Sequence, residues 1–223
     1  MKYQDATVPA QLVIAEPQEF DPGSVDAFTR SQFWDTADAD DLLDSCHYQV
    51  MIFDMISAGL PYKERCDLLM DWMETALSLY PDCAAVYIEA SGKFFAADQI
   101  RNHQIPREDR FIYFCVNVRF FNIQGTNDSI VDTLGLYAID LPDVQYHFHG
   151  LDPNQVVNHA YNTASYIYAN NAPVKNGETI DGILNGVLSR RIQWKCQYED
   201  ALIQPVRCVM DICAGAYAAG QRK

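Results

Sequence analysis

The clearest strand and helix signals of this chain lie in residues 130–171, IVDTLGLYAIDLPDVQYHFHGLDPNQVVNHAYNTASYIYANN. Asp152 can accept hydrogen bonds from the N–H groups of a first helical turn. Pro153 suits the first helical position, because its missing N–H costs nothing there. After Pro153, apolar residues recur at steps of three and four positions, which is typical of one buried helix face. We therefore predict a helix of about 17 residues that ends before Pro173.

The segment before this helix, residues 135–150, is extended in character. Pro142 indicates a turn or a bulge within it. Beyond that point apolar and polar residues alternate, so His147 and His149 fall on one face of a predicted strand.

The length and composition predict an α+β fold. The chain has 223 residues, of which 49% are hydrophobic, enough for a full core. Predicted strands and helices alternate along it without the regular units of a doubly wound parallel sheet. We expect mainly antiparallel or mixed sheets with helices packed on one side. The chain would form a single domain, residues 1–223, or two similar half-domains joined near residues 102–110.

The other predicted elements are spread along the chain. We predict strands at residues 10–15, 47–56, 83–90, 111–123, 187–200 and 201–214, and helices at residues 21–34, 62–80 and 97–102. The runs 47–56 and 111–123 are continuously apolar, which favours buried strands, the second of them central in its sheet. Pro205 indicates an edge position or a bulge. Residues 177–186 are predicted as a loop and residues 216–223 as a frayed tail.

Arg119 is the one charged residue in the run 111–123. A buried guanidinium requires a carboxylate or a carbonyl oxygen beside it, because an unpaired buried charge is costly. Asp132 is the candidate partner.

The charge of the chain narrows the possible ligands. The net charge of −14 repels phosphate backbones, so we expect no nucleic acid partner. It suits a basic protein partner, although acidity also simply keeps a protein in solution. No stretch approaches the 18 apolar residues of a membrane span, and the start MKYQDATVPAQ lacks the apolar segment of a signal peptide. We therefore expect a cytoplasmic protein that does not bind membranes.

The seven cysteines lie mostly within apolar runs, as reduced cysteines of cytoplasmic proteins do. No CxxC pair is present, which argues against structural zinc. We predict no cofactor.

Several phrases occur together in one order: AGLPYKER at residues 58–65, VNVRFFNI at 116–123, DTLGL at 132–136, LPDVQYHF at 141–148 and GLDP at 150–153. With these phrases the chain resembles a bacterial family catalogued as domain of unknown function 4261, over nearly all of its length after residue 45. The resemblance implies a soluble bacterial protein and assigns no catalytic residue. Small acidic bacterial proteins often serve as immunity partners of secreted toxins, which is an analogy of class and not a motif match.

A metal site is the most suggestive catalytic hypothesis. His147 and His149 would lie roughly 7 Å apart on one strand face, close enough to share an ion. Asp132 is the first choice for a third ligand, with Asp143 and His159 as alternatives. No H-E-x-x-H spacing supports the metal site. The opposing interpretation is a pair of half-exposed histidines on a polar strand face.

Two other catalytic arrangements are weaker. Cys46 and His47 are chain neighbours, which point to opposite faces of a strand and cannot activate each other. Asp132, Asp140 and Asp143 cluster in sequence, but acids are frequent in a chain that has 30 of them.

The sequence therefore favours a non-enzymatic protein that binds another protein, with neutralisation of a basic toxin domain as the most concrete version. Thirteen tyrosines could anchor such an interface. The predicted contact residues are acidic: Asp38, Asp40, Asp41, Asp44, Glu199 and Asp200. The alternative is a metal-dependent enzyme of unknown substrate that uses His147 and His149.

Overall fold

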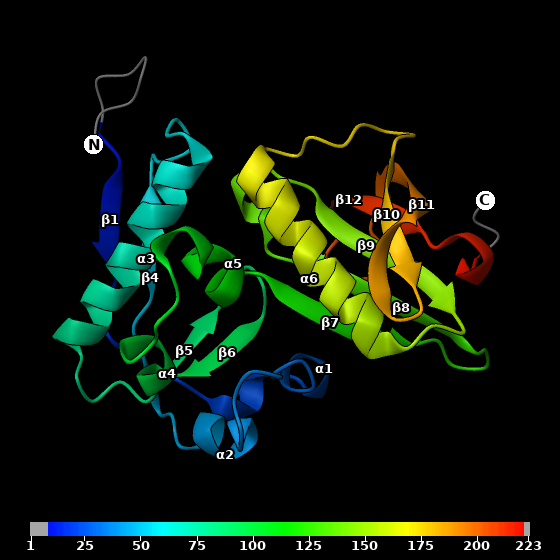
Figure 1. Cartoon of the computed structure of the whole chain (residues 1–223). Helices are drawn as coiled ribbons and strands as arrows, with labels where there is room; N and C mark the ends of the chain where they lie inside the picture. Colours follow the sequence, from blue (N-terminus) through cyan, green and yellow to red (C-terminus); the bar gives the residue numbers. More distant parts are fainter. Residues whose placement is uncertain (1–8, 221–223) are drawn as a thin grey trace. The chain divides into compact units, whose positions relative to one another are not determined.

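The computed structural model describes residues 9–220 (Figure 1). The chain divides into two compact units, the first ending at Cys115 and the second beginning at Val116. The sequence placed a joint near residues 102–110. The predicted absence of a signal peptide concerns residues 1–8, and the predicted tail includes residues 221–223; both segments lie outside the described residues.

Helices and strands occur in both units, which confirms the predicted α+β class. In the part of the chain that the structure covers, no helix combines the length and the apolar character needed to cross a membrane.

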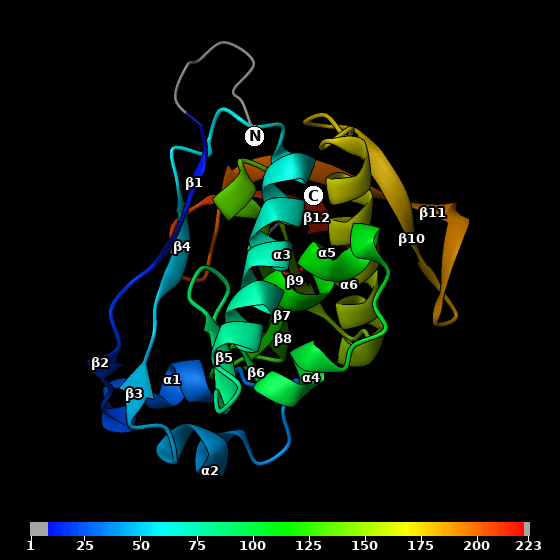
Figure 2. The same cartoon turned by 90° about the vertical axis from the view of Figure 1, so that its left-hand side faces the viewer.

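The first unit combines one long helix with three small antiparallel ladders. Its strands are β1 (Gln11–Ile14) paired with β4 (Ile52–Met55), β2 (Gln18–Glu19) paired with β3 (Tyr48–Gln49), and β5 (Ala85–Ile88) paired with β6 (Lys93–Ala96). Its α-helices are α1 (Ala27–Arg30), α2 (Ala39–Asp44), α3 (Tyr62–Leu79), α4 (Ala97–Arg101) and α5 (Arg110–Cys115). Figure 2 shows β1 and β4 side by side along α3.

The predicted helix at residues 62–80 is confirmed as α3. Its buried residues follow the predicted three- and four-residue spacing: Cys66, Met70, Met73, Ala76 and Leu77. The methionines of this face are therefore core residues.

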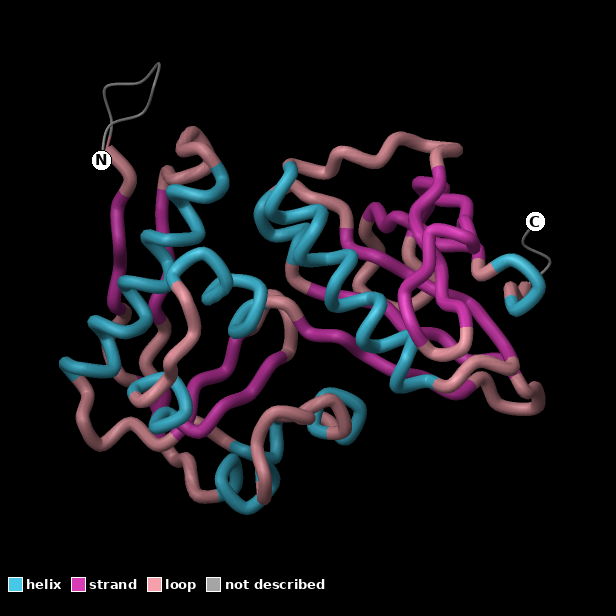
Figure 3. Tube along the Cα trace, viewed as in Figure 1, coloured by secondary structure: helices cyan, strands magenta, loops and turns pink. Residues whose placement is uncertain are grey.

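The second unit is built on a six-stranded sheet with the order β10-β11-β12-β9-β8-β7. Figure 3 draws the strands in magenta. The strands are β7 (Asn117–Asn122), β8 (Asp128–Leu134), β9 (Asp143–His149), β10 (Thr179–Leu184), β11 (Val187–Asp200) and β12 (Cys208–Cys213). The pair β12–β9 is parallel and the other pairs are antiparallel, so the sheet is mixed, as predicted.

Helix α6 (Pro153–Asn170) covers one face of this sheet, over β7, β8 and β9 (Figure 1). The helix begins as predicted: the Asp152 side chain accepts a hydrogen bond from the Asn154 N–H at 3.0 Å, and Pro153 takes the first position. It ends at Asn171, whose φ of 56° is left-handed. Tyr146 and Phe148 of β9 are buried on the face opposite to His147, so the predicted alternation is confirmed.

The prediction of a central strand at residues 111–123 is wrong. Residues 110–115 form α5, with Phe111, Ile112 and Phe114 buried and Tyr113 on the exposed side. The rest forms β7, an edge strand of the sheet. A short apolar run fits a buried helical turn as well as a strand, and the periodicity of so few residues cannot separate them.

The prediction of one buried strand at residues 47–56 is also wrong. The segment forms two short strands, β3 and β4, and Tyr48, Met51 and Phe53 are exposed. Strands β3 and β4 each belong to a two-stranded ladder, and such a ladder leaves a face open to solvent.

The predicted helix at residues 21–34 is likewise replaced by two short turns. The side chain of Asp21 accepts from the Gly23 N–H and that of Asp26 from the Thr29 N–H, so each aspartate begins a separate turn.

Three further corrections concern the end of the chain. The segment 177–186 is not a loop but contains β10, joined to β11 by a two-residue turn, Asn185-Gly186, with φ of 52° and 81°. The strand predicted at 201–214 begins only at Cys208, and β12 is an interior strand, so Pro205 marks the preceding loop and not an edge or a bulge. The described part of the predicted tail, residues 216–220, is not frayed, because Ala219 is buried and its N–H donates to the His147 carbonyl at 2.9 Å.

Candidate functional site

The ion pair between Arg119 and Asp132, predicted from the sequence, is confirmed. Strands β7 and β8 place the two residues directly opposite each other. Nε of Arg119 donates to Oδ1 of Asp132 at 2.9 Å, and Nη2 donates to Oδ2 at 2.6 Å. The two residues are 3% and 0% exposed, so this is a buried two-point contact.

Arg207, from the loop at residues 201–207, joins the same pair. Its Nη2 donates to Oδ2 of Asp132 at 2.7 Å, and its Nε donates to Oδ2 of Asp143 at 3.1 Å. Asp143 also accepts from the Thr133 hydroxyl at 2.9 Å and the Leu136 N–H at 3.1 Å. Arg119, Asp132, Asp143 and Arg207 together form the buried ionic cluster, in which two arginines face two carboxylates.

The cluster ties the loop at residues 201–207 to the sheet. Arg119 Nη1 donates to the Gln204 carbonyl at 3.0 Å, and Arg207 Nη1 donates to the Pro205 carbonyl at 2.9 Å. The Leu202 N–H donates to Oε1 of Gln145, a fully buried side chain of β9, at 2.7 Å. The loop is therefore held by side chains at both of its ends.

The electrostatics of the cluster are those of a closed structural site. Burial raises the pKa of Asp143, and Arg207 and the hydrogen bond from Thr133 oppose that shift. Asp132 directs one oxygen at Arg119 and shares the other between both arginines. A buried charge is tolerated because its partners replace the hydrogen bonds of water.

Glu199 and Asp211 lie beside the cluster. Gln145 donates through Nε2 to Asp211 Oδ1 at 3.1 Å and to Glu199 Oε1 at 3.2 Å. Glu199, predicted as a partner-binding residue, is therefore half-buried and turned toward the sheet, whereas Asp200 is exposed.

The structure does not bring Asp132 together with His147 and His149. Along β8 and β9, Asp132 lies opposite Gln145, while His147 lies opposite Ile130. His147 Nε2 is 3.6 Å from Oδ2 of Asp128, and His149 is exposed. Within residues 9–220, no group of three or more His, Cys, Asp or Glu side chains is arranged to hold a metal ion.

His159, an alternative third ligand, lies on the buried face of α6. Its Nε2 is 2.8 Å from the Asp181 carbonyl and must carry the hydrogen, so its Nδ1 accepts from the Tyr146 hydroxyl at 2.7 Å. Burial lowers the pKa of His159 and raises that of Tyr146. The pair is a satisfied polar contact inside the core.

The cysteines and the acidic residues Asp140 and Asp143 offer no reactive pair. All seven cysteines are thiols outside disulfides, and burial raises the pKa of Cys115 and of Cys196 to about 12. Asp143 is bound by Arg207, and Asp140 is exposed at the end of a short 3-10 helix, Leu136–Ile139.

Each unit has a cavity, and of the residues considered for a catalytic site only Asp140 lines one of them. In the second unit a cavity of about 330 Å³ is lined by Tyr137, Asp140, Leu141, Pro142, Tyr198 and Cys208. In the first unit a cavity of about 300 Å³ is lined by Glu74, Leu77, Ser78, Ile100, Arg101 and His103. In this first-unit cavity His103 Nε2 lies 3.1 Å from Glu74, and Arg101 donates to the carbonyl of Tyr80 at the end of α3. These polar groups are therefore already bonded within the protein.

The four aspartates predicted to bind a partner are exposed on α2 and at its start: Asp38, Asp40, Asp41 and Asp44. Arg30 reaches Asp40 at 3.1 Å and Asp44 at 2.9 Å. Neither Asp38 nor Asp41 is in an ion pair with a described residue.

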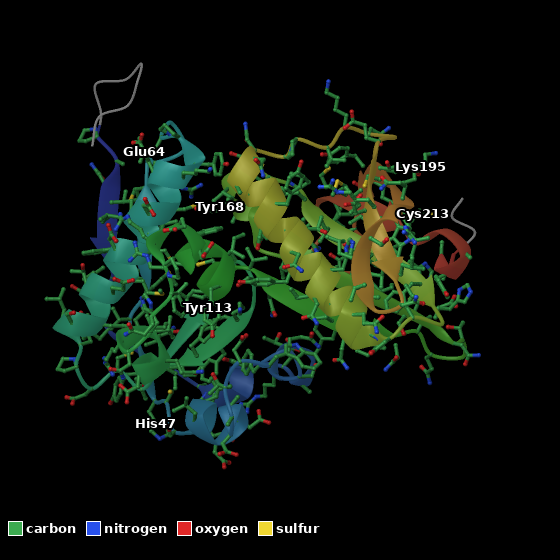
Figure 4. All side chains as sticks on the ribbon, in the orientation of Figure 1. His47, Glu64, Tyr113, Tyr168, Lys195 and Cys213 are labelled. Carbon is green, nitrogen blue, oxygen red and sulfur yellow. The ribbon has the colours of Figure 1, made fainter. Side chains whose placement is uncertain are left out.

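A run of exposed apolar side chains follows α2 in the chain. The sequence alone did not indicate that these side chains are exposed. The exposed fractions are 71% for Tyr48, 54% for Met51, 36% for Phe53, 43% for Met55 and 51% for Ile56. His47, labelled in Figure 4, marks the start of this run. We call these five residues and the four aspartates of α2 the recognition surface.

Fold and cluster define an α+β protein whose mixed sheet carries a buried ionic cluster under a fixed loop. Residues 132–213 match the family described as Domain of unknown function (DUF4261), which confirms the predicted resemblance over this segment. The match includes Asp132, Asp143 and Arg207 of the cluster. No curated protein and no solved structure matches the chain.

Replacing Asp132 with Asn tests the cluster. The variant leaves two buried guanidinium groups with one carboxylate, so we expect the free energy of unfolding to fall by about 3–5 kcal/mol in urea denaturation. Asp128→Asn, on the same strand and partly exposed, should change it by less than about 1 kcal/mol. Equal losses in the two variants would contradict this assignment.

His159 predicts a pH dependence of stability. Its folded pKa is below the ordinary value of 6.5, so the unfolded chain binds the proton first as the pH falls. The free energy of unfolding should therefore decrease from pH 6.5 downward. In His159→Gln this part of the slope should be absent, whereas the exposed control His149→Gln should keep it. The same slope in wild type and His159→Gln would refute the prediction.

Proposed function

We propose that this chain acts by binding a protein with a basic and partly apolar surface, and that neutralising a bacterial toxin is its concrete role. One observation carries the proposal: the run Tyr48 to Ile56 exposes five large apolar side chains directly after an acidic helix. Singly scattered exposed apolar residues need no explanation, whereas five of them within nine residues of sequence, preceded by an acidic helix, are what supports a protein interaction site here.

The aromatic and methionine side chains of the recognition surface suit the centre of an interface. Tyr, Phe and Met are enriched at interface centres, where they supply large contact areas. Phe53 and Met55 alternate along β4 and share one face of the β1–β4 ladder, and Met51 directly precedes the strand. These side chains offer exposed apolar contact area.

The acidic side chains that precede the apolar run in the sequence suit a basic partner. Asp38 and Asp41 are exposed and do not take part in the ion pairs of Arg30. The whole chain has a net charge of −14. Charges of this kind accelerate encounter with an oppositely charged protein more than they tighten the final complex. The acidic helix would therefore steer the partner, and the apolar run would hold it.

The polar chemistry of the second unit leaves binding as the better-supported function. Asp132 is bound by two arginines and does not meet His147 or His149. As part of the proposal we place the protein in a bacterial cytoplasm, where seven unbridged cysteines are stable.

The test uses the product of the gene beside this one, expressed as a candidate toxin. We expect the chain to bind that protein with an affinity that falls steeply with salt, and to restore growth of cells that express it. Tyr48→Ser and Phe53→Ser should each weaken binding at least tenfold, or by about 1.4 kcal/mol, in calorimetric titration.

Leu79→Ser is the matched control, because Leu79 is 59% exposed in the same unit but outside the recognition surface. It should bind like the wild type. Absence of binding and of growth rescue would refute the toxin role, and equal weakening by all three variants would refute the assigned surface.

A further inference from the structure

The hairpin formed by β10 and β11 concentrates positive charge in an acidic chain. Most described cationic side chains are engaged in ion pairs: Arg30, Arg65, Lys93, Arg101, Arg107, Arg110, Arg119 and Arg207. Arg190, Arg191 and Lys195 of β11 are exposed. Arg190 is 96% exposed with Asp181 at the 4.0 Å limit of contact, and Arg191 and Lys195 pair with no described carboxylate. Lys195 is labelled in Figure 4.

The hairpin holds these cations on a rigid base. Asp181 pairs with Gln193 but Gly182 pairs with Ser189, so residues 190–192 form a bulge on β11. A Cβ on Gly182 would lie 2.7 Å from Ile192 and Trp194, which shows how closely those side chains cover the glycine. Trp194 is 2% exposed and anchors the bulge in the core.

The turn end of the hairpin adds apolar surface beside the arginines. Val187 is 65% exposed and Leu188 is 63% exposed. β10 is the edge strand of the sheet, and the hairpin projects there (Figure 2). We call Val187, Leu188, Arg190, Arg191 and Lys195 the hairpin patch.

We propose that the hairpin patch of one copy of this chain docks on the recognition surface of a second copy. The hairpin has the properties of the partner proposed above, basic residues next to apolar ones, so this inference rests on that proposed function. Each copy has both patches, so the contact joins unlike patches of two identical chains. The bound hairpin would cover the recognition surface until a toxin displaces it.

Salt acts on both the repulsion between the two acidic chains and the attraction between the two patches. At about 0.1 M salt the screening length is about 10 Å, so the repulsion between two chains of charge −14 is largely screened, while the contacts within the interface persist. Further salt should therefore weaken the association.

Analytical ultracentrifugation of the full chain, without any toxin, tests the proposal. We expect the sedimentation coefficient to rise with protein concentration at moderate salt and to return to the monomer value at high salt. The hairpin variant Arg190→Glu, Arg191→Glu, Lys195→Glu and the helix variant Asp38→Lys, Asp41→Lys should each remain monomeric.

An equal mixture of the two variants should associate again, because the acidic hairpin of one then meets the basic helix of the other. Lys175→Glu, an exposed charge reversal in the second unit, should behave like the wild type. Circular dichroism of every variant checks folding, and the restored mixture shows that both variants are folded.

A monomer at all concentrations, or a mixture that stays monomeric, would overturn self-association. So would an association that nuclease treatment abolishes, because the hairpin would then be binding nucleic acid. These results leave toxin binding untouched, since the experiment contains no toxin; self-association without toxin binding would instead overturn the proposed function alone.

Discussion

The bridge that Arg207 makes between Asp132 and Asp143 is the contact on which the second unit depends. One guanidinium joins β8, β9 and the loop at residues 201–207, and Arg119 adds β7 to the same cluster. Two positive and two negative charges balance there, so the sheet can bury charged groups on the face away from α6. Removing one member would leave a buried charge without its counterpart, which is far more costly than losing a surface ion pair.

This arrangement divides the chemistry of the chain into two kinds. Inside the second unit, carboxylates and arginines hold a loop over a sheet and satisfy each other. On the surface of the first unit, the aspartates of α2 are followed in the chain by a run of apolar side chains that are 36–71% exposed. In the proposed function the acidic excess of the chain serves recognition as well as solubility, and in the proposed self-association the few exposed cations of β11 bind the acidic surface of a second copy.

The sequence predicts the two long helices, α3 and α6, the alternation of β9 and the contact between Arg119 and Asp132. Arg119 identifies its partner because a lone charge in an apolar run must be neutralised, and Asp132 is near in the chain. Arg207 could not be found in this way, because it lies 75 residues from Asp132 and nothing in its neighbourhood signals burial. Apolar content alone cannot say whether a run such as 47–56 is covered or exposed. The turn Asn185-Gly186, in contrast, is a strong hairpin signal that identifies β10 once it is noticed.

Hydrogen exchange at the Leu202 amide tests whether the buried charges belong to the fold or to a site that opens. This N–H donates to Gln145 within the loop that covers the sheet. We expect protection of the Leu202 amide equal to that of the amides in β8 and β9, with exchange only through global unfolding. Fast exchange at Leu202 while β8 and β9 remain protected would contradict it, because the loop would then be a lid over an accessible charged site.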